Sequence, residues 1–173
     1  MPETGGAPPG KVLKYTSYLF KNPKLSEEEF HDHWRNHHSR NPLEAMVKHG
    51  VIRYTQYHCT EATRGLLSPM VQARKDNPNS ELKFEIMPFD AIVQIWVPDW
   101  ETWLKVAREP IFGKAIFEDE SYLFDCTRSF TTLGWEEDML LDGKIVMPGY
   151  QGLSKCDCKC GLCSHKCEAQ PDD

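Results

Sequence analysis

The chain contains the run Ser26-Glu-Glu-Glu-Phe-His-Asp-His-Trp-Arg-Asn-His-His38, which has the pattern of an amphipathic helix. Ser26 is followed three residues later by Glu29, a capping box that predicts the first turn of the helix. Acidic residues next to the cap also stabilise the positive end of the helix dipole. Four of the chain's seven histidines lie in this run, so it is also the first place to look for acid–base chemistry.

The helical repeat assigns these side chains to faces. With about 3.6 residues per turn, Phe30, Trp34 and His38 form one stripe that we expect to pack inward. His33 falls at the edge of that stripe, beside whatever cavity the helix covers. His31 is predicted to lie on the outer side of the helix.

Strand patterns lie on both sides of this helix. The segment before it, 11–20, is rich in β-branched and aromatic residues and ends at a turn. After it, Asn41-Pro42 predicts a kink near Arg40, and Lys48-His49-Gly50 is a typical helix stop. Three more strands are predicted at 51–60, 89–97 and 127–135. A helix capped by Asp99 and a short amphipathic segment at 111–124 separate the last two strands.

The resulting order is β-α-β-β-α-β, which predicts an α+β, ferredoxin-like fold with both helices on one face of an antiparallel sheet. The other face carries Trp, Tyr and Phe side chains and needs a cover. A second copy of the chain is the simplest cover, so we expect a homodimer in which two sheets form a dimeric α+β barrel. A pocket is expected between each sheet and its own helices.

The 173 residues fit one domain with two tails. We predict a disordered N-terminal tail at 1–10, a folded domain at 11–146 and a Cys-rich C-terminal tail at 147–173. Between the second and third strands, 61–88 is a long excursion that is expected to hold a short helix at 66–74. Connections of that length usually serve a function.

Composition excludes several classes of protein. The net charge is −6 and the Lys and Arg residues are scattered, which argues against a nucleic-acid partner. No apolar run resembles a signal peptide or reaches membrane-spanning length, so no membrane partner is expected. The odd cysteine count predicts reduced thiols. We expect a soluble, cytoplasmic protein.

At this point the chain resembles the EthD family of dimeric α+β barrel proteins. The resemblance rests on the helix motif at 30–38 and on the strand Phe89-Asp-Ala-Ile-Val-Gln-Ile-Trp96. It is closer still to the EthD-like decarboxylases of fungal aromatic polyketide clusters, which act on anthrone and atrochrysone-type carboxylic acids. The segments that carry this closer resemblance are 47–58, 62–64 and 127–136.

Two positions depart from the family pattern. The proline that usually follows the helix histidine by two residues is Arg40 here. Near 119–121, where the decarboxylases have a His-containing stretch, this chain has Glu120. The first change affects the position of His38, and the second affects its acid–base partner.

The resemblance implies a cofactor-independent lyase that removes CO2 from an aromatic polyketide-type acid in secondary-metabolite biosynthesis. Such a reaction needs a proton donor at carbon and groups that hold the developing enolate oxygen. The predicted proton donors are His33 and His38, with His58 as the alternative. Asp90 is expected to fix the tautomer of a histidine. No cofactor and no metal are expected in the pocket.

The predicted substrate-binding residues have three kinds of role. The second and third strands supply groups that orient the substrate. One of two arginines is expected to form a two-pronged ion pair with the substrate carboxylate. Two tryptophans either form a wall of the pocket or belong to the core. The three kinds are, in turn, Tyr54, Gln56 and Gln94; Arg64 and Arg128; and Trp34 and Trp96.

Other functions stay open at this stage. A dehydratase or cyclase of the same pathway class has the same requirements, and a non-catalytic EthD-like accessory protein to an oxidative pathway is also compatible. The tail offers a third possibility, because five cysteines and His165 lie close together there. They predict either one thiolate-bound metal ion such as zinc or a disordered tail with reactive thiols.

Overall fold

The structure is a computed structural model of the chain, and it describes residues 8–77, 85–150 and 152. The chain divides into two compact units, residues 1–136 and residues 137–173. The first unit holds the helix run and all the predicted strands.

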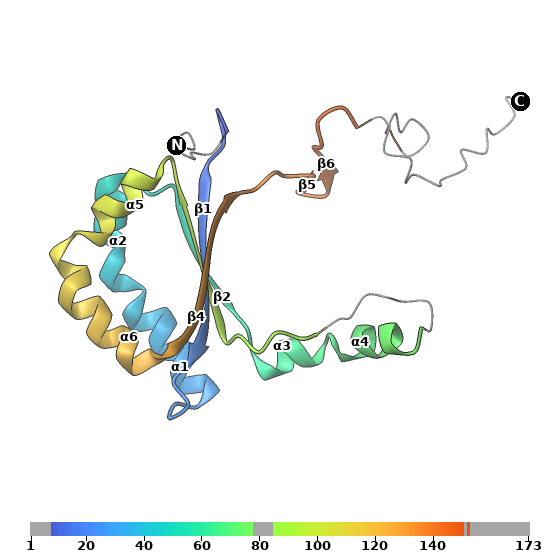
Figure 1. The fold of residues 1–173 in the computed structure, drawn as a ribbon, viewed down its shortest axis with the longest axis horizontal. Helices are drawn as coiled ribbons and strands as arrows, with labels where there is room; N and C mark the ends of the chain where they lie inside the picture. The colour runs from blue at the N-terminus through green and yellow to red at the C-terminus, as the bar shows by residue number, and fades with distance from the viewer. Residues whose placement is uncertain (1–7, 78–84, 151, 153–173) are drawn as a thin grey trace, which may run out of the picture. The chain divides into compact units, whose positions relative to one another are not determined.

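A four-stranded antiparallel sheet forms the centre of the first unit (Figure 1). Its strands are β1 (Leu13–Lys21), β2 (Arg53–His58), β3 (Ala91–Val97) and β4 (Phe124–Trp135), in the spatial order β2-β3-β1-β4. β1 lies between β3 and β4, and β3 lies between β1 and β2. This is the ferredoxin-like βαββαβ arrangement, so the predicted fold class is confirmed. The dimer remains a prediction.

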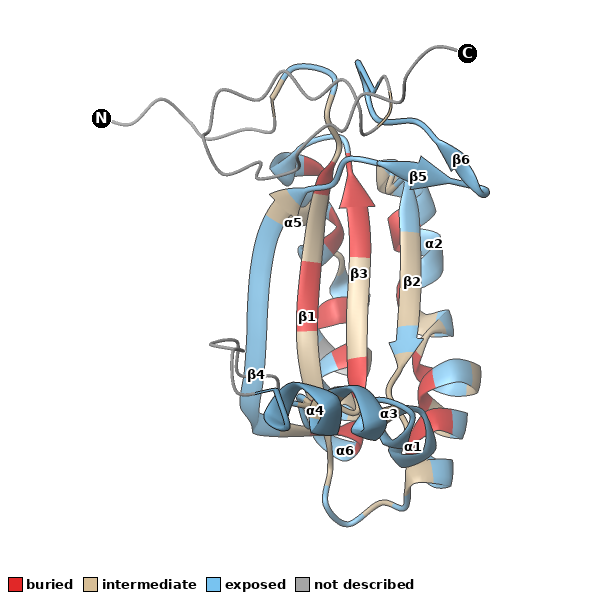
Figure 2. Cartoon of the chain, turned by 90° about the vertical axis from the view of Figure 1, so that its right-hand side faces the viewer, coloured by how far each residue is buried: buried red, intermediate tan, exposed pale blue. Residues whose placement is uncertain are grey.

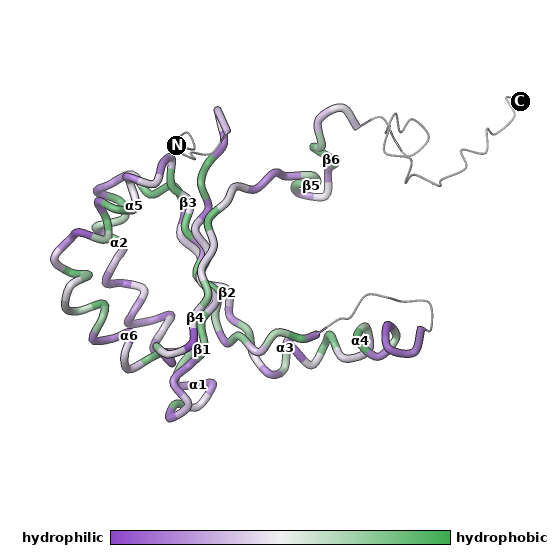
Figure 3. Tube along the Cα trace, in the orientation of Figure 1, coloured by the Kyte–Doolittle hydropathy of each residue, from purple (hydrophilic) through white to green (hydrophobic). Residues whose placement is uncertain are grey.

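Helices cover one face of this sheet, as Figure 1 shows. Apolar side chains of β1 and β3 alternate toward them, and Ile95 and Val97 are buried there against Val106 and Ile116. Figure 3, which colours the tube by hydropathy, shows hydrophobic and hydrophilic stretches following one another along the helices of this layer. The covering elements are α1 (Glu27–His33), η1 (Trp34–His38), α2 (Arg40–His49), α5 (Trp100–Ala107), η2 (Phe112–Ile116) and α6 (Phe117–Leu123).

The predicted helix signals are confirmed. Ser26 Oγ accepts a hydrogen bond from the backbone N–H of Glu29 at 3.1 Å, and the Glu29 carboxylate accepts one from the backbone N–H of Ser26 at 2.8 Å. Gly50 ends α2 with φ 82°, a left-handed conformation that glycine adopts without steric cost. Asp99 caps α5 by accepting from the backbone N–H of Thr102 at 2.8 Å.

The helix is interrupted just before Arg40, as the Asn41-Pro42 pattern predicts, and α2 begins at Arg40. The irregularity is the five-residue π-helical stretch η1, in which the backbone N–H of Ser39 donates to the carbonyl of Trp34 at 3.2 Å. Pro42 has no N–H for the carbonyl of His38, so the α-helical ladder is interrupted at this point. The chain responds by inserting one extra residue into the preceding turn, and the α-helix resumes at Arg40.

The buried stripe of the helix run is confirmed, and the outer position of His31 is wrong. Phe30 and Trp34 are fully buried, and His38 is also buried. His31 is only 8% exposed because its ring lies against His58 of β2, with the two ring centroids 4.9 Å apart. The face of α1 that packs on the sheet is therefore wider than one stripe.

The second face of the sheet is open in the first unit, and β4 is exposed along most of its length (Figure 2). The long excursion forms α3 (Glu61–Gly65) and α4 (Ser68–Lys75), which lie on this open side at one end of the sheet. A short helix in this region was predicted at 66–74, and α4 confirms it within two residues.

The second unit contains a hairpin that the sequence reading missed. Its strands are β5 (Leu140–Leu141) and β6 (Lys144–Ile145), joined by Asp142 at φ 48° and Gly143 at φ 74°. An Asp-Gly pair between apolar residues is a recognised hairpin signal. The tail cysteines and His165 lie outside the described residues, as do residues 1–7 of the predicted N-terminal tail. Among the described helices, none is long and apolar enough to span a membrane.

Candidate functional site

A cavity of about 300 Å3 lies between the sheet and the helix layer of the first unit. Its position agrees with the pocket predicted between sheet and helices. We call it the inner cavity. Its apolar wall includes Val93, Ile95, Trp103, Phe112 and Ile116, and its polar groups are Tyr15, Ser17, His38, Tyr54 and Glu120.

His38 is the imidazole that reaches the inner cavity, and a carboxylate from another element holds it. Its Nδ1 lies 2.7 Å from Oδ2 of Asp119, which α6 carries. The carboxylate accepts the Nδ1 proton, so Nε2 is the ring atom left for chemistry. Burial lowers the pKa of His38, while the hydrogen bond and charge of Asp119 raise it and so offset part of that effect.

Glu120 follows Asp119 on α6 and lines the same inner cavity as His38. Burial raises the pKa of its carboxyl, and the neighbouring negative charge of Asp119 raises it further. A carboxyl in such a setting holds its proton more readily than an ordinary glutamate. The inner cavity thus contains a histidine tuned toward its neutral form and a carboxyl tuned toward its protonated form.

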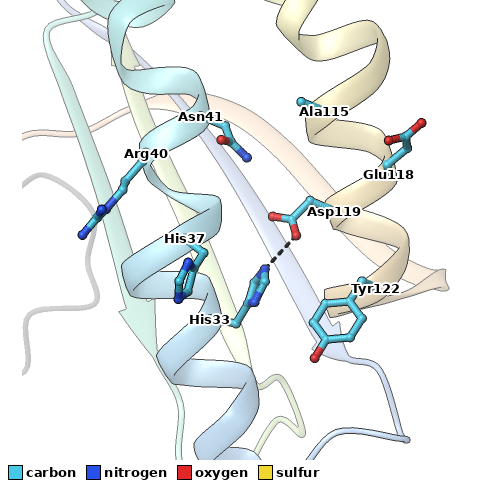
Figure 4. Close-up of a pocket in the computed structure, with 8 residues that line it drawn as sticks. All are labelled: His33, His37, Arg40, Asn41, Ala115, Glu118, Asp119 and Tyr122. Carbon is cyan, nitrogen blue, oxygen red and sulfur yellow. Dashed lines mark hydrogen bonds and ion pairs between the residues drawn. The ribbon is translucent and has the colours of Figure 1, made fainter.

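The second oxygen of Asp119 binds His33 on the opposite side of the helix layer. Oδ1 lies 2.7 Å from His33 Nε2, and Figure 4 shows this contact at the edge of an outer cleft of about 560 Å3 between the helices. The outer cleft is lined by His33, His37, Arg40, Asn41, Ala115, Glu118, Asp119 and Tyr122. It is open and mainly polar, in contrast to the inner cavity.

The π turn explains how one carboxylate reaches both histidines. Five residues of α-helix rotate the chain by about 140° beyond a full turn, which would point His33 and His38 in well-separated directions. The extra residue in η1 reduces that separation, so both rings meet the two oxygens of Asp119. π turns inside α-helices are frequent at functional sites.

The predicted alternative donor, His58, lies elsewhere. Its Nδ1 is 2.8 Å from Nδ1 of His31, and its ring packs on Trp34 at 4.7 Å between centroids. Burial lowers the pKa of His58 to about 4, with His31 and Arg35 adding to the effect. Burial likewise lowers the pKa of His31. This pair is outside the lining of the inner cavity.

The structure does not bring the other charged candidates to the inner cavity. Asp90 accepts a hydrogen bond from the backbone N–H of Lys21 at 2.9 Å and lies 3.7 Å from the Arg64 guanidinium, and among the described residues no histidine hydrogen-bonds to its carboxylate. Arg64 donates to the carbonyls of Cys59 and Phe89, at 2.9 and 2.7 Å, and so joins two chain segments. Arg128 stacks at 3.8 Å on the ring of Phe20, on the open side of the sheet.

Two further candidates also lie on the open side. Trp96 donates its indole N–H to Glu136 at 2.5 Å, and the cations of Lys14 and Arg53 lie over its ring. Gln94 accepts from Thr55 at 3.4 Å on the same side.

Trp34 and Gln56 lie on the helix side. Trp34 is fully buried core, as the alternative interpretation predicted. Gln56 donates to the carbonyl of Trp34 and to the hydroxyl of Tyr54, both at 3.1 Å. Tyr54, by contrast with these two, lines the inner cavity itself.

Asp119 is the main residue that sequence reasoning missed. It is 86 residues from His33 and 81 from His38, so no local spacing connects them. The departure from the family pattern at Glu120 was the available signal, because it pointed to the same turn of α6. In the part of the chain that the structure describes, no group of three or more His, Cys, Asp or Glu side chains is arranged to hold a metal ion.

Comparisons with known proteins agree with this architecture. The family profile of the EthD domain matches residues 22–127. A dehydratase named aurZ from Gibberella zeae is 29% identical over 138 residues, which cover 80% of this chain and 86% of that protein. A decarboxylase named claH from Passalora fulva is 27% identical over 151 residues, covering 87% of this chain and 92% of that protein.

Among solved structures, an EthD family protein from Bacillus halodurans is 14% identical, with a TM-score of 0.45 over 73% of this chain and 99% of that one. The predicted resemblance to the EthD family and to its fungal decarboxylases is confirmed, and dehydratases are among the similar proteins as well.

Proposed function

Because the chain belongs to the EthD domain family, we propose that it is a lyase that removes CO2 from an aromatic polyketide-type carboxylic acid by acid–base catalysis. Relatives named decarboxylase and dehydratase support an enzyme of the lyase type in secondary-metabolite biosynthesis. The observation that carries the proposal is the inner cavity, where His38 on Asp119 and the Glu120 carboxyl, whose pKa is raised by burial, share an apolar enclosure.

The pair of groups accounts for the proton balance of decarboxylation. Neutral His38 takes the proton of the substrate's carboxyl at Nε2, the bond between the carboxyl and the ring carbon breaks, and CO2 leaves. Glu120 gives its proton to that carbon, and the proton on His38 later restores Glu120 through water. No electron is gained or lost, so the reaction requires no redox cofactor. The apolar wall favours release of CO2 because it solvates a carboxylate poorly.

Dehydration is the second candidate, and the same pair of groups supports it. A base must remove a proton from carbon while an acid protonates the departing hydroxyl. His38 and Glu120 match these two roles within one cavity. The identity of the substrate therefore selects between loss of CO2 and loss of water.

The test is an assay of purified full-length protein with a panel of aromatic and β-keto polyketide-type acids, without added cofactor. Mass spectrometry follows loss of CO2 or of water from each substrate. We expect turnover of at least one acid with loss of CO2, and a fall of roughly 10²-fold or more in kcat for Glu120→Gln, since a general acid contributes about that much. Glu118→Gln, on the same helix but in the outer cleft, is the matched control and should keep its activity.

Two results would count against the proposal. Loss of water alone across the panel would favour the dehydratase. Absence of both products, in protein shown to be folded by circular dichroism, would favour an accessory role without catalysis.

The proposal includes a homodimer formed through the open face of the sheet. Tyr57 and Phe130 are 59% and 60% exposed there, and Tyr18 and Phe89 add to an aromatic cluster next to them. Exposed apolar patches of this kind commonly mark interaction sites. Light scattering should give twice the mass of one chain, and Phe130→Glu should shift the measured mass toward that of the monomer. A monomeric wild type at micromolar concentration would contradict the proposed dimer.

A further inference from the structure

Two tyrosines stand at the same level on the sheet surface that forms one side of the inner cavity. Tyr15 on β1 and Tyr54 on β2 each pair in register with Ile95 of the strand between them. All three side chains therefore point to the helix side, with the phenols on either side of an apolar centre. Two strand spacings separate their backbones, which is roughly 9–10 Å.

The hydroxyl of Tyr54 has a proton that the protein does not use. Gln56 donates both of its amide protons in hydrogen bonds, one to the carbonyl of Trp34 and one to the Tyr54 oxygen. The carbonyl fixes which end of the amide is nitrogen, so Tyr54 must be the acceptor. Its own O–H has no acceptor among the described residues. Burial raises the pKa of Tyr54, which keeps that proton in place.

Tyr15 repeats this arrangement one strand beyond. Ser17, two residues along β1, donates to the Tyr15 oxygen at 2.7 Å, as Gln56 donates to Tyr54 two residues along β2. The ring of Tyr15 is stacked on Trp103 at 5.5 Å between centroids, which fixes its direction. Either hydroxyl of this pair can donate; when Ser17 donates, as it does in this arrangement, the Tyr15 O–H proton is left for a ligand oxygen. Both rings line the inner cavity.

We propose that Tyr15 and Tyr54 are substrate-binding residues that donate to two oxygen atoms at opposite ends of a flat fused-ring ligand. Ile95 lies between them and Val93 follows two residues along β3, so that both would contact the ring face of such a ligand. The inference deepens the proposed function and rests on it for the identity of the site. A phenol O–H that meets a substrate oxygen also stabilises negative charge that develops there when a neighbouring carbon loses CO2 or a proton.

Binding is the direct test, and it needs no turnover. Isothermal titration calorimetry compares 2,6-dihydroxynaphthalene, which has an oxygen at each end, with 2-naphthol, which has one. Wild type should bind the diol more tightly by roughly 2- to 10-fold, the value of one additional hydrogen bond. Tyr15→Phe and Tyr54→Phe should each remove that preference while leaving the affinity for 2-naphthol within about 3-fold. Tyr18→Phe, which removes a hydroxyl from the opposite face of β1, should keep it.

The outcomes separate this inference from the proposed function. Equal affinity of wild type for the two ligands would overturn it, and this comparison stands even when a variant does not fold. A preference that survives in both Tyr15→Phe and Tyr54→Phe would overturn it as well. A preference that depends on both tyrosines, in a protein without lyase activity, would support the donor pair and reject the proposed reaction.

Discussion

Two histidine pairs on the same helix run have opposite settings. His33 and His38 meet through the carboxylate of Asp119, whereas His31 and His58 meet ring to ring with no carboxylate between them. Burial lowers the pKa of both His38 and His58, and at His38 Asp119 offsets this with a hydrogen bond as well as a charge. At His31 the charges of Glu27 and Asp90 oppose the effect of burial without a hydrogen bond to the ring. The comparison teaches that the element packed against a histidine, more than its own helix, decides whether a hydrogen-bonded carboxylate opposes the effect of burial on its pKa.

The largest predicted effect separates the two pairs by activity. His38→Ala should lower kcat by roughly 10²- to 10⁴-fold, because it removes the base from the inner cavity. His31→Gln, on the same helix and also buried, should change kcat by less than about 5-fold. Steady-state kinetics with the substrate found in the panel measures both. Equal losses in the two variants would mean that the comparison has no catalytic meaning.

A smaller effect is predicted for the carboxylate that distinguishes the first pair. Asp119→Asn should lower kcat by roughly 10-fold or more, because Nδ1 of His38 loses its charged acceptor. The sign of the pH effect follows from the structure: Asp119 raises the pKa of His38, so its loss lowers that pKa. The acidic limb of the pH–rate profile, which reports deprotonation of the base, should move to lower pH. A limb that stays in place would assign it to another group.

The smallest predicted effect concerns stability and belongs to the second pair. The pKa of His58 is lowered to about 4 in the folded chain. At a pH between this value and the ordinary histidine pKa, His58 is therefore protonated in the unfolded chain and neutral in the folded chain. The free energy of unfolding should therefore be unaffected by His58 above about pH 6.5 and should fall as the pH drops toward 4. Urea unfolding at pH 7.0 and 5.0 measures this, and His58→Gln should reduce the difference. His37→Gln, which changes a histidine outside the pair, serves as the control and should leave the difference unchanged.

The fold was largely predictable because its signals are local. The cap at Ser26, the stop at Gly50 and the alternation along β3 each occupy fewer than ten consecutive residues. The burial of His38 was also predictable, since its position on the buried stripe follows from helical spacing.

The rest of the site depends on contacts that no local pattern encodes. Asp119 comes from a helix more than eighty residues away, and the rotation that lets His33 and His38 share it comes from a π turn. Arg64 and Arg128 were expected at the substrate because of their chemistry, yet the structure places them on backbone carbonyls and on an aromatic ring. Residue type predicted what these side chains can do, and only the packing of elements shows where they do it.

The π turn at Trp34–His38 also has a consequence for how related sites are found. A search for paired histidines that assumes regular helical spacing looks for partners three or four residues apart, and it would pass over this pair. Here the informative interval is five, joined to an adjacent Asp-Glu dipeptide late in the domain. Straightening the turn into a regular α-helix of the same length would rotate the two rings apart, so the backbone geometry of this segment, and not only its composition, makes the shared contact.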